Sequence, residues 1–347
     1  MSSPAPTDLA EVLSPAWLTS ALGARYPGVV VRSVTEVERL ETVASKVRFA
    51  VDYETTAGHA IPSALCVKGY FGATSAQWVS VGSREARFYA ELAPALPVQV
   101  PPTVYTGIDA DTQHGVVVMH DLVAAGSTFL TALSPYTPDQ VAATLGELAL
   151  LHARTWDDAR MRATPWLAPV FESYANALSD EELGALLDGP RGDGIPATVR
   201  RPGRIKASLG ALARRHAGGP VCLIHADAHA GNLYEAPDGR PGLIDWQTYQ
   251  LAHWSIDVAY HIGAVLEPAE RAASERELLA HYLDRRSAHG VATPAFDDAW
   301  ADYRAGLAYG YFMWAITRRV DEQVMLRFNR RMGTAVSEHD SLGLLGV

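Results

Sequence analysis

The first third of the chain alternates apolar and polar residues with the two-residue period of β-strands. In the segment 45–55, Val47, Phe49, Val51 and Tyr53 fall on one face. Apolar or β-branched runs of similar length predict four further strands, over residues 29–40, 63–71, 101–109 and 115–122.

A single helix is expected among these strands. The segment 82–96 places Phe88 and Leu92 on one face, with Ser83 as the expected N-cap. Pro94 is expected to end the helix, because proline cannot continue it. The predicted order in this part of the chain is therefore strands, one helix, strands.

Beyond residue 122 the apolar residues recur with the period of a helix. The strongest helix prediction covers residues 137–156, where Thr137 is the N-cap, Pro138 stands at the first helical position and Gln140 completes a capping box. Further helical patterns cover residues 180–218, with a break at 188–196, and residues 254–333.

Two short strands interrupt this helical part. The runs 222–234 and 241–247, joined by the Gly-containing turn 235–240, predict a hairpin. The chain therefore divides into a strand-rich part, residues 1–122, and a larger helical part, residues 123–347, which is an α+β organisation.

Composition and charge narrow the function classes. About half of the 347 residues are apolar, and the net charge of −10 argues against nucleic acid or an anionic membrane surface as the main partner. The N-terminal segment lacks the basic start and apolar core of a secretion signal, and no apolar run is long enough to span a membrane, so we expect a cytoplasmic protein. The cysteines, Cys66 and Cys222, stand in apolar runs and form neither a disulfide framework nor a zinc signature.

The run CLIHADAHAGNLY, residues 222–234, brings an apolar strand directly to two histidines, an aspartate and an asparagine. Such groups are costly to bury unless they are paired, hydrogen-bonded or bound to a metal. Three interpretations are open: a polar loop at a strand end, a catalytic loop, or a zinc site formed by the alternating residues His225, Asp227 and His229.

The spacing of the polar residues favours a catalytic loop. Asp227 and Asn232 have the D-x4-N spacing of a kinase catalytic loop, and Asp245 follows at the end of the next strand. One carboxylate can deprotonate an attacking hydroxyl, while an amide oxygen and a second carboxylate hold Mg²⁺. An ATP kinase also needs a strand lysine paired with a helix glutamate. Lys68 and Glu85 stand in the right order, although a lysine at a strand end can also simply reach toward solvent.

These residues, together with the motifs VMHDL, LLHARTW, HADAHAGN and LIDWQ, resemble the aminoglycoside phosphotransferase and choline kinase group, and within it the ecdysteroid-kinase-like branch. The resemblance covers roughly residues 35–264. It implies a protein-kinase-like bilobal fold, with an N-terminal antiparallel sheet and one main helix, followed by a larger helical lobe. It also implies ATP- and Mg²⁺-dependent phosphorylation of a hydroxyl group on a small molecule.

The resemblance assigns roles to individual residues. Asp227 is expected to be the catalytic base with Asn232 beside it, and Asn232 and Asp245 are expected to bind Mg²⁺. Lys68 is expected to hold the nucleotide phosphates, with Glu85 behind it. Further nucleotide contacts are expected from Ser45 and from the backbone of the hinge residues Met119, His120 and Asp121, which would read adenine.

Two departures from the family pattern bear on nucleotide binding. The first hairpin, RLETVASKVRF, contains no glycine, so Ala44 and Ser45 would have to offer backbone N–H groups to phosphate. Ala226 stands where the family usually has glycine, and His120 where it often has an acidic residue. Neither departure removes a catalytic group.

The remaining polar residues of the motifs have structural interpretations. His225 is expected to brace the loop, and His229 to be structural or a neighbour of the phosphates. His152 lies on an apolar helix face and is expected in the core. Asp257 resembles the structural aspartate that anchors the catalytic loop in this family.

Two other function classes fit the sequence less well. A protein kinase is disfavoured, because Ala226 replaces the arginine of H-R-D and Asp245 is followed by Trp246 and Gln247 instead of Phe-Gly. A pseudokinase that binds nucleotide or a partner is the non-enzymatic alternative. The glycine-free hairpin is its only support, and the retention of the five expected site residues argues against it: Lys68, Glu85, Asp227, Asn232 and Asp245.

The acceptor is expected to be a small, neutral or cationic hydroxylated molecule. Four aromatic residues would either wall the acceptor cleft or fill the core: Trp254, Tyr303, Tyr309 and Trp314. Three aspartates could supply the carboxylates that an aminoglycoside needs or could lie on a solvated helix face: Asp297, Asp298 and Asp302.

Overall fold

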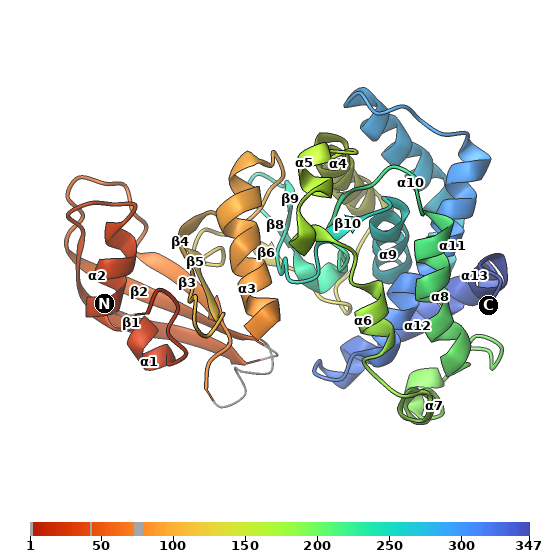
Figure 1. Ribbon diagram of the computed structural model, residues 1–347, viewed down its shortest axis with the longest axis horizontal. Coiled ribbons are helices and arrows are strands. Elements are labelled where there is room, and N and C mark those ends of the chain that lie inside the picture. The colour runs from red at the N-terminus through yellow and green to blue at the C-terminus, as the bar shows by residue number, and fades with distance from the viewer. Residues whose placement is uncertain (1–2, 42–43, 73–78) are drawn as a thin grey trace.

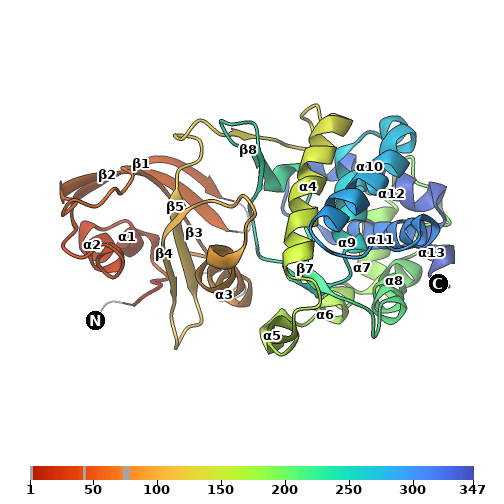
Figure 2. The same cartoon turned by 90° about the horizontal axis from the view of Figure 1, so that it is seen from above.

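The computed structural model describes residues 3–41, 44–72 and 79–347, and these form two lobes (Figure 1). The N-terminal lobe is built on an antiparallel sheet flanked by helices. The C-terminal lobe is mostly helical, and the cartoon seen from above shows its long helices packed side by side (Figure 2). The predicted α+β organisation is confirmed.

The sheet of the N-terminal lobe has five strands in the order β1-β2-β3-β5-β4, and every neighbouring pair is antiparallel. The five predicted strands are confirmed, with these bounds: β1 (Val30–Glu41), β2 (Ser45–Thr55), β3 (Ala64–Gly69), β4 (Thr103–Ile108) and β5 (Gly115–His120).

The two faces of the sheet have different partners. Val47, Phe49 and Val51 are buried with the helices α1 (Leu9–Val12) and α2 (Pro15–Gly23), as the alternation predicted. Since successive side chains of a strand point to opposite faces, the even-numbered residues of β2 lie on the other face, where Lys46 reaches Asp245 of the helical lobe.

The helix α3 (Val79–Arg87) carries Glu85 and continues as a π-helical turn over Phe88–Leu92. The prediction that Ser83 caps this helix is wrong, because the chain is already helical at Val79 and the Ser83 hydroxyl donates to the Ser80 carbonyl. Pro94 lies in a closing 3-10 turn, Ala93–Ala95, and Leu96 is extended, so the predicted end is confirmed.

Two glycines let α3 approach the sheet closely. A Cβ atom placed on Gly115 of β5 would lie 2.4 Å from the carbonyl oxygen of Gly82 in α3. Any larger residue at position 115 would push the helix away from the sheet. This contact therefore helps to set the distance between Glu85 and the strand that holds Lys68.

The helical lobe contains these helices: α4 (Pro138–Arg154), α5 (Ala159–Arg162), α6 (Phe171–Ala175), α7 (Asp180–Leu187), α8 (Pro202–Arg215), α9 (Ser255–Val265), α10 (Pro268–Ala288), α11 (Phe296–Ile316), α12 (Glu322–Glu338) and α13 (Ser341–Leu344). The predicted capping box of α4 is confirmed, with Thr137 and Gln140 bonding each other's backbone N–H groups. The α4 side chains Val141, Leu145 and Leu148 are fully buried.

Short strands in this lobe hold the loops of interest. β8 (Leu233–Glu235) and β9 (Pro241–Leu243) form the predicted hairpin, and β6 (Thr128–Phe129) pairs with β8. β7 (Cys222–Ile224) pairs with β10 (Gln250–Ala252).

The sheet of the first lobe ends at His120, two residues before the predicted boundary between residues 122 and 123, which stays a prediction. Within the ranges that the structure describes, no helix combines the length and apolar character needed to cross a membrane.

Candidate active site

The loop after β7 is held by one buried carboxylate at the start of α9. Asp257 accepts the backbone N–H groups of His225 and Ala226, both at 2.7 Å, and faces Nε2 of His152 at 3.1 Å. Burial alone would raise the pKa of Asp257. The hydrogen bond from His152 and the backbone N–H group of His225 lower it by more, so the pKa of Asp257 lies below its ordinary value. The predicted anchoring role of Asp257 and the core position of His152 agree with this geometry.

His225 braces the same loop. Its Nδ1 atom accepts the backbone N–H of Asp227 at 3.2 Å, so Nε2 carries the proton and donates to the carbonyl of Ile244 at 2.9 Å. Both ring nitrogens are therefore engaged. Across the described ranges, no group of three His, Cys, Asp or Glu side chains is arranged to hold a metal ion, so the zinc interpretation has no geometric support.

Two residues of this constellation adopt a left-handed backbone conformation. Ala226 and Asp245 both have φ of 64°. Glycine reaches this region freely, whereas residues with a Cβ are strained there. The conformation of Ala226 agrees with the glycine that the resemblance leads us to expect at this position. Strain of this kind is concentrated at functional sites.

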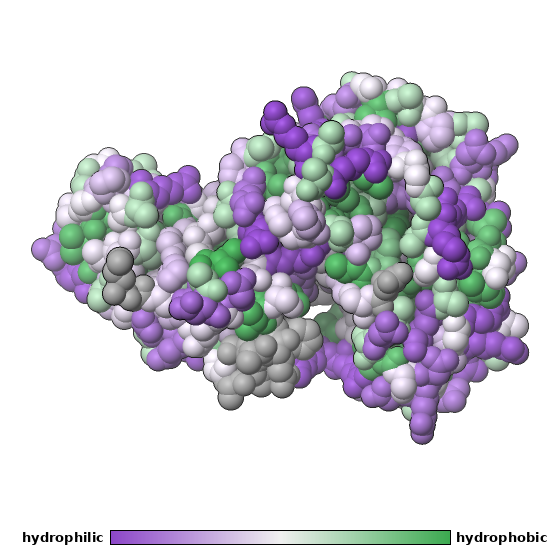
Figure 3. All heavy atoms as spheres, in the orientation of Figure 1, coloured by the Kyte–Doolittle hydropathy of each residue, from purple (hydrophilic) through white to green (hydrophobic). Residues whose placement is uncertain are grey.

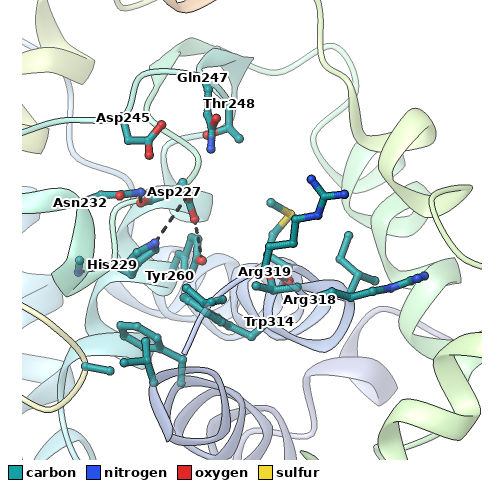
Figure 4. A pocket seen from close by; sticks show the side chains of 18 of the residues that line it. Asp227, His229, Asn232, Asp245, Gln247, Thr248, Tyr260, Trp314, Arg318 and Arg319 are labelled. Carbon is teal, nitrogen blue, oxygen red and sulfur yellow. Dashed lines mark hydrogen bonds and ion pairs between the residues drawn. The ribbon is translucent and has the colours of Figure 1, made fainter. Parts of the chain in front are cut away.

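Asp227 lies at the centre of a polar cluster (Figure 4). Its Oδ2 atom accepts from the Asn232 amide at 2.9 Å, and its Oδ1 atom accepts from the Tyr260 hydroxyl at 2.8 Å. The Nε2 atom of His229 lies 3.6 Å from Oδ2. Burial, and then the charge of Asp227, raise the pKa of Tyr260 well above its ordinary value, so Tyr260 remains a hydrogen-bond donor.

A second cluster joins the two lobes. The Lys68 Nζ atom lies 2.6 Å from Glu85 Oε2 and 2.7 Å from Asp245 Oδ1, and the Lys46 Nζ atom lies 3.6 Å from Asp245 Oδ2. Burial would raise the pKa of Asp245, but Lys68 and Lys46 bring it well below its usual range. The three residues predicted for this part of the site thus converge, and a fourth, Lys46, joins them.

Asp245 is held in place by its neighbours in sequence. Trp246 stacks on Phe88 at 4.0 Å between ring centroids, which docks the segment after Asp245 against the turn that follows α3. The Tyr70 hydroxyl donates to Gln247 at 3.0 Å, which adds a second link between the lobes.

The predicted nucleotide-binding residues of the first lobe have mixed positions. The Ser45 hydroxyl donates to Glu41, and Ser45 does not line the cavity described below, whereas Ala44 and Lys46 on either side of it do. The tip of that hairpin, residues 42 and 43, lies outside the described residues. The hydroxyl of Ser45 is already engaged by Glu41. A contact between the backbone N–H group of Ser45 and a phosphate stays a prediction.

The predicted hinge, Met119–Asp121, already uses part of its backbone. The N–H of His120 donates to Pro102 at 2.9 Å, and the N–H of Asp121 donates to Ala64 at 3.2 Å. The Asp121 carboxylate pairs with Arg48 and accepts backbone N–H groups of the turn that follows. These contacts fix the connection between the lobes, and adenine recognition by this segment stays a prediction.

A cavity of about 820 Å³ connects the two clusters. The space-filling view shows the surface hollowed between the lobes (Figure 3). Asp227, Asn232 and Asp245 line the cavity together with Lys46, and Tyr260, Trp314 and Phe328 line its side toward α9, α11 and α12. The cavity therefore has the size of a small-molecule pocket, and polar side chains of both clusters line it.

A model of the phosphotransferase enzyme family matches residues 71–304. The chain belongs to this family. No curated protein matches the sequence significantly.

Solved structures show that this family member has the fold of choline and ethanolamine kinases. The choline kinase LicA from Streptococcus pneumoniae superposes with a TM-score of 0.51 at 16% identity, over 92% of this chain and 98% of that chain. A structure of LicA in complex with AMP gives 0.51 at 15%, over 94% and 98%. An ethanolamine kinase from Plasmodium vivax gives 0.53 at 10%, over 93% and 86%. The predicted protein-kinase-like fold and the resemblance to this group are confirmed, whereas the ecdysteroid-kinase-like branch stays a prediction.

Two residues that line the cavity, Tyr260 and Lys46, carry no distinctive signal in the sequence. Tyr260 lies on α9, a helix that is buried on all sides, so no pattern marks its hydroxyl as a partner of Asp227. Lys46 stands in an alternating strand, where a lysine is usually a solvated residue.

The aromatic residues expected near the acceptor separate into two groups. Trp314 lines the cavity and stacks on Phe328 at 4.2 Å. Trp254, Tyr303 and Tyr309 are core residues: Trp254 stacks on another ring, and the Tyr303 and Tyr309 hydroxyls are hydrogen-bonded inside the lobe. Tyr309 donates to the Ala226 carbonyl, so it supports the loop that carries Asp227.

The three candidate acceptor carboxylates are not at the cavity. Asp302 pairs with Arg215 at 2.8 Å, and neither it nor Asp297 or Asp298 lines the cavity. Among the described residues that line it, the carboxylates are Asp227 and Asp245. Since both belong to the two polar clusters described above, the described wall does not present the separate acidic group expected for an aminoglycoside.

Proposed function

We propose that this protein is an ATP-dependent kinase that transfers the terminal phosphoryl group of ATP to a hydroxyl group of a small molecule. The observation that carries the proposal is the meeting of two clusters at one cavity. Lys68, Glu85 and Asp245 form one cluster, and Asp227 with Asn232 forms the other. Membership of the phosphotransferase family supports the same reaction class.

The residues present fit a nucleotide triphosphate with Mg²⁺. The amide nitrogen of Asn232 donates a hydrogen bond to Asp227. The amide oxygen of Asn232 therefore points away from Asp227. That oxygen and the Asp245 carboxylate are the hard donors that Mg²⁺ prefers. Lys68 is buried and keeps its charge, because Asp245 and Glu85 outweigh the effect of burial and raise its pKa. In the proposed reaction Mg²⁺ neutralises charge on the phosphates.

In the proposed reaction each group of the chain has one task. Asp227 orients the acceptor hydroxyl and takes its proton as the oxygen bonds to phosphorus, while the bond between that phosphorus and the ADP oxygen breaks. Tyr260 and Asn232 hold the Asp227 carboxylate in place through its two oxygens. Lys68 holds phosphate oxygens, and Glu85 fixes the position of Lys68.

Screening with purified protein tests this function. Wild-type protein is incubated with ATP, Mg²⁺ and a panel of amino alcohols, sugars and aminoglycosides, and phosphorylated products are identified by mass spectrometry. We expect at least one acceptor whose phosphorylation depends on Asp227. ADP binding without any phosphorylated product across the panel would instead support the pseudokinase alternative.

A further inference from the structure

Lys46 on β2 has no role in the motifs of the proposed kinase reaction, yet it lies beside the ion-pair cluster. The register of the sheet places Lys46 directly opposite Lys68 on β3, so both side chains leave the same face. Both reach the same carboxylate, since Lys68 approaches Oδ1 of Asp245 and Lys46 approaches Oδ2.

The use of lysine at this position is unusual for this chain. Of its 29 Lys and Arg residues only three are lysines: Lys46, Lys68 and Lys206. Two of the three therefore stand opposite each other in the candidate active site. Lysine carries a compact charge that serves as a phosphate ligand, whereas the planar fork of arginine favours bidentate pairing.

The charges around Lys46 favour the binding of an anion that the protein itself does not supply. Like charges directly opposite each other in a sheet are destabilising. Lys68 is matched by Glu85 and Asp245 at hydrogen-bond distance, whereas Lys46 shares only the longer contact to Asp245. The Lys46 side chain is 28% exposed and lines the cavity. Its Nζ atom can therefore reach a ligand without leaving a buried partner unpaired.

The position of Lys46 along the sheet matches the phosphate end of a nucleotide. His120, in the predicted hinge, lies opposite Leu65 of β3, and Lys68 lies three residues further along that strand. This places the lysine pair about 10 Å from the hinge end of β3, at roughly 3.3 Å per residue. Nearer the hinge, Arg48 on the same face of β2 as Lys46 is already paired with Asp121.

We propose that Lys46 is a second phosphate-binding cation, which contacts the phosphates beyond the α-phosphate and compensates for the glycine-free first hairpin. The contact is a charge-assisted hydrogen bond from Nζ to a phosphate oxygen. Lys46 acts together with Lys68, so the nucleotide is held by two side-chain charges where a glycine-rich turn would supply backbone N–H groups.

Calorimetric titration with ADP and with AMP, in EDTA, tests the proposal apart from catalysis and from metal binding. Removal of the Lys46 charge by Lys46→Met should weaken ADP binding by about tenfold to a hundredfold, as expected for a lost charge-assisted bond. AMP binding should change by less than about threefold, because AMP lacks the contacted phosphates. Lys46→Arg, which keeps the charge, should retain most of the ADP affinity.

The matched control is Lys206→Met, because Lys206 pairs with Asp180 on α7 and does not line the cavity. Lys206→Met should bind ADP and AMP with wild-type affinity. Lys46→Gln serves as a second neutral variant at position 46. A thermal melt of each variant confirms that it is folded. ADP affinity within twofold of wild type in the neutral variants, or equal losses for ADP and AMP, would overturn the role of Lys46. Wild-type ADP binding without phosphoryl transfer would overturn the proposed function alone.

Discussion

Replacing Asp257 by asparagine should destabilise the protein more than any exposed substitution, because Asp257 is the shared acceptor that holds the loop after β7. The carboxylate is fully buried and faces three N–H groups, from His225, Ala226 and His152. An asparagine keeps the shape of the side chain but replaces one oxygen with an NH₂ group. That group must face at least one of the N–H donors.

The magnitude follows from these contacts. One buried N–H group loses its acceptor, which costs about 1–3 kcal/mol. The two remaining bonds lose their charge assistance, at about 1 kcal/mol each, since bonds to charged groups are worth about 1.5–3 kcal/mol and neutral ones about 1 kcal/mol. The expected loss in the free energy of unfolding is therefore about 3–5 kcal/mol, in the range for breaking a buried charged contact.

Urea unfolding followed by tryptophan fluorescence measures this loss. With an m value of about 3 kcal/mol/M, the midpoint should fall by about 1–1.7 M. The matched control is Asp298→Asn, an exposed position on α11, which should change stability by no more than about 0.5 kcal/mol. Faster hydrogen exchange at the amides of His225 and Ala226 should accompany the loss in Asp257→Asn. A destabilisation below about 1 kcal/mol would refute the anchoring role.

Three further predictions concern the ion-pair cluster, the support of the proposed base Asp227 and acid stability. Asp245→Ala should remove the Mg²⁺-dependent part of the rise in melting temperature that ATP produces, and an unchanged Mg²⁺ effect in thermal melts would contradict its role as a metal ligand. Tyr260→Phe removes one of the two hydrogen bonds to the Asp227 carboxylate and should lower kcat about tenfold with little change in the KM for ATP; steady-state kinetics at saturating acceptor decide this. Burial lowers the pKa of His216 to about 4 and that of His253 to about 2, so the unfolded chain binds protons that the folded chain does not. The free energy of unfolding should thus decline as the pH falls from about 6.5 toward 4. In a variant with phenylalanine at both His216 and His253, the urea midpoint should fall less between pH 7 and pH 5 than in the wild type.

The parts of the candidate site that depend on neighbouring residues in the chain could be predicted from the sequence. The alternation in β2 and the spacing of Asp227, Asn232 and Asp245 are local features, and each motif stands at the end of a short strand. Lys68 and Glu85 could be paired in advance only through the resemblance, because the distance between them is set by the close approach of α3 to the sheet.

The parts that could not be predicted depend on register and packing between distant segments. Lys46 becomes a site residue through its position opposite Lys68, which a strand pattern alone does not define. Along α11, Tyr309 and Trp314 are both buried aromatics of a helix with apolar residues on nearly all sides. Only the packing of α9 and α12 against that helix separates the cavity-lining ring from the core ring.

The decisive test of the proposed reaction is a comparison of phosphoryl transfer from ATP to an acceptor hydroxyl between wild type and Asp227→Asn. The product is quantified with an acceptor found in the screen, and ADP affinity is measured on the same samples. We expect Asp227→Asn to form product at least about a hundredfold more slowly, the usual cost of a missing general base, while ADP affinity stays within twofold of the wild-type value. Unchanged product formation in Asp227→Asn would contradict the assignment of Asp227 as the base and with it the proposed reaction at this site.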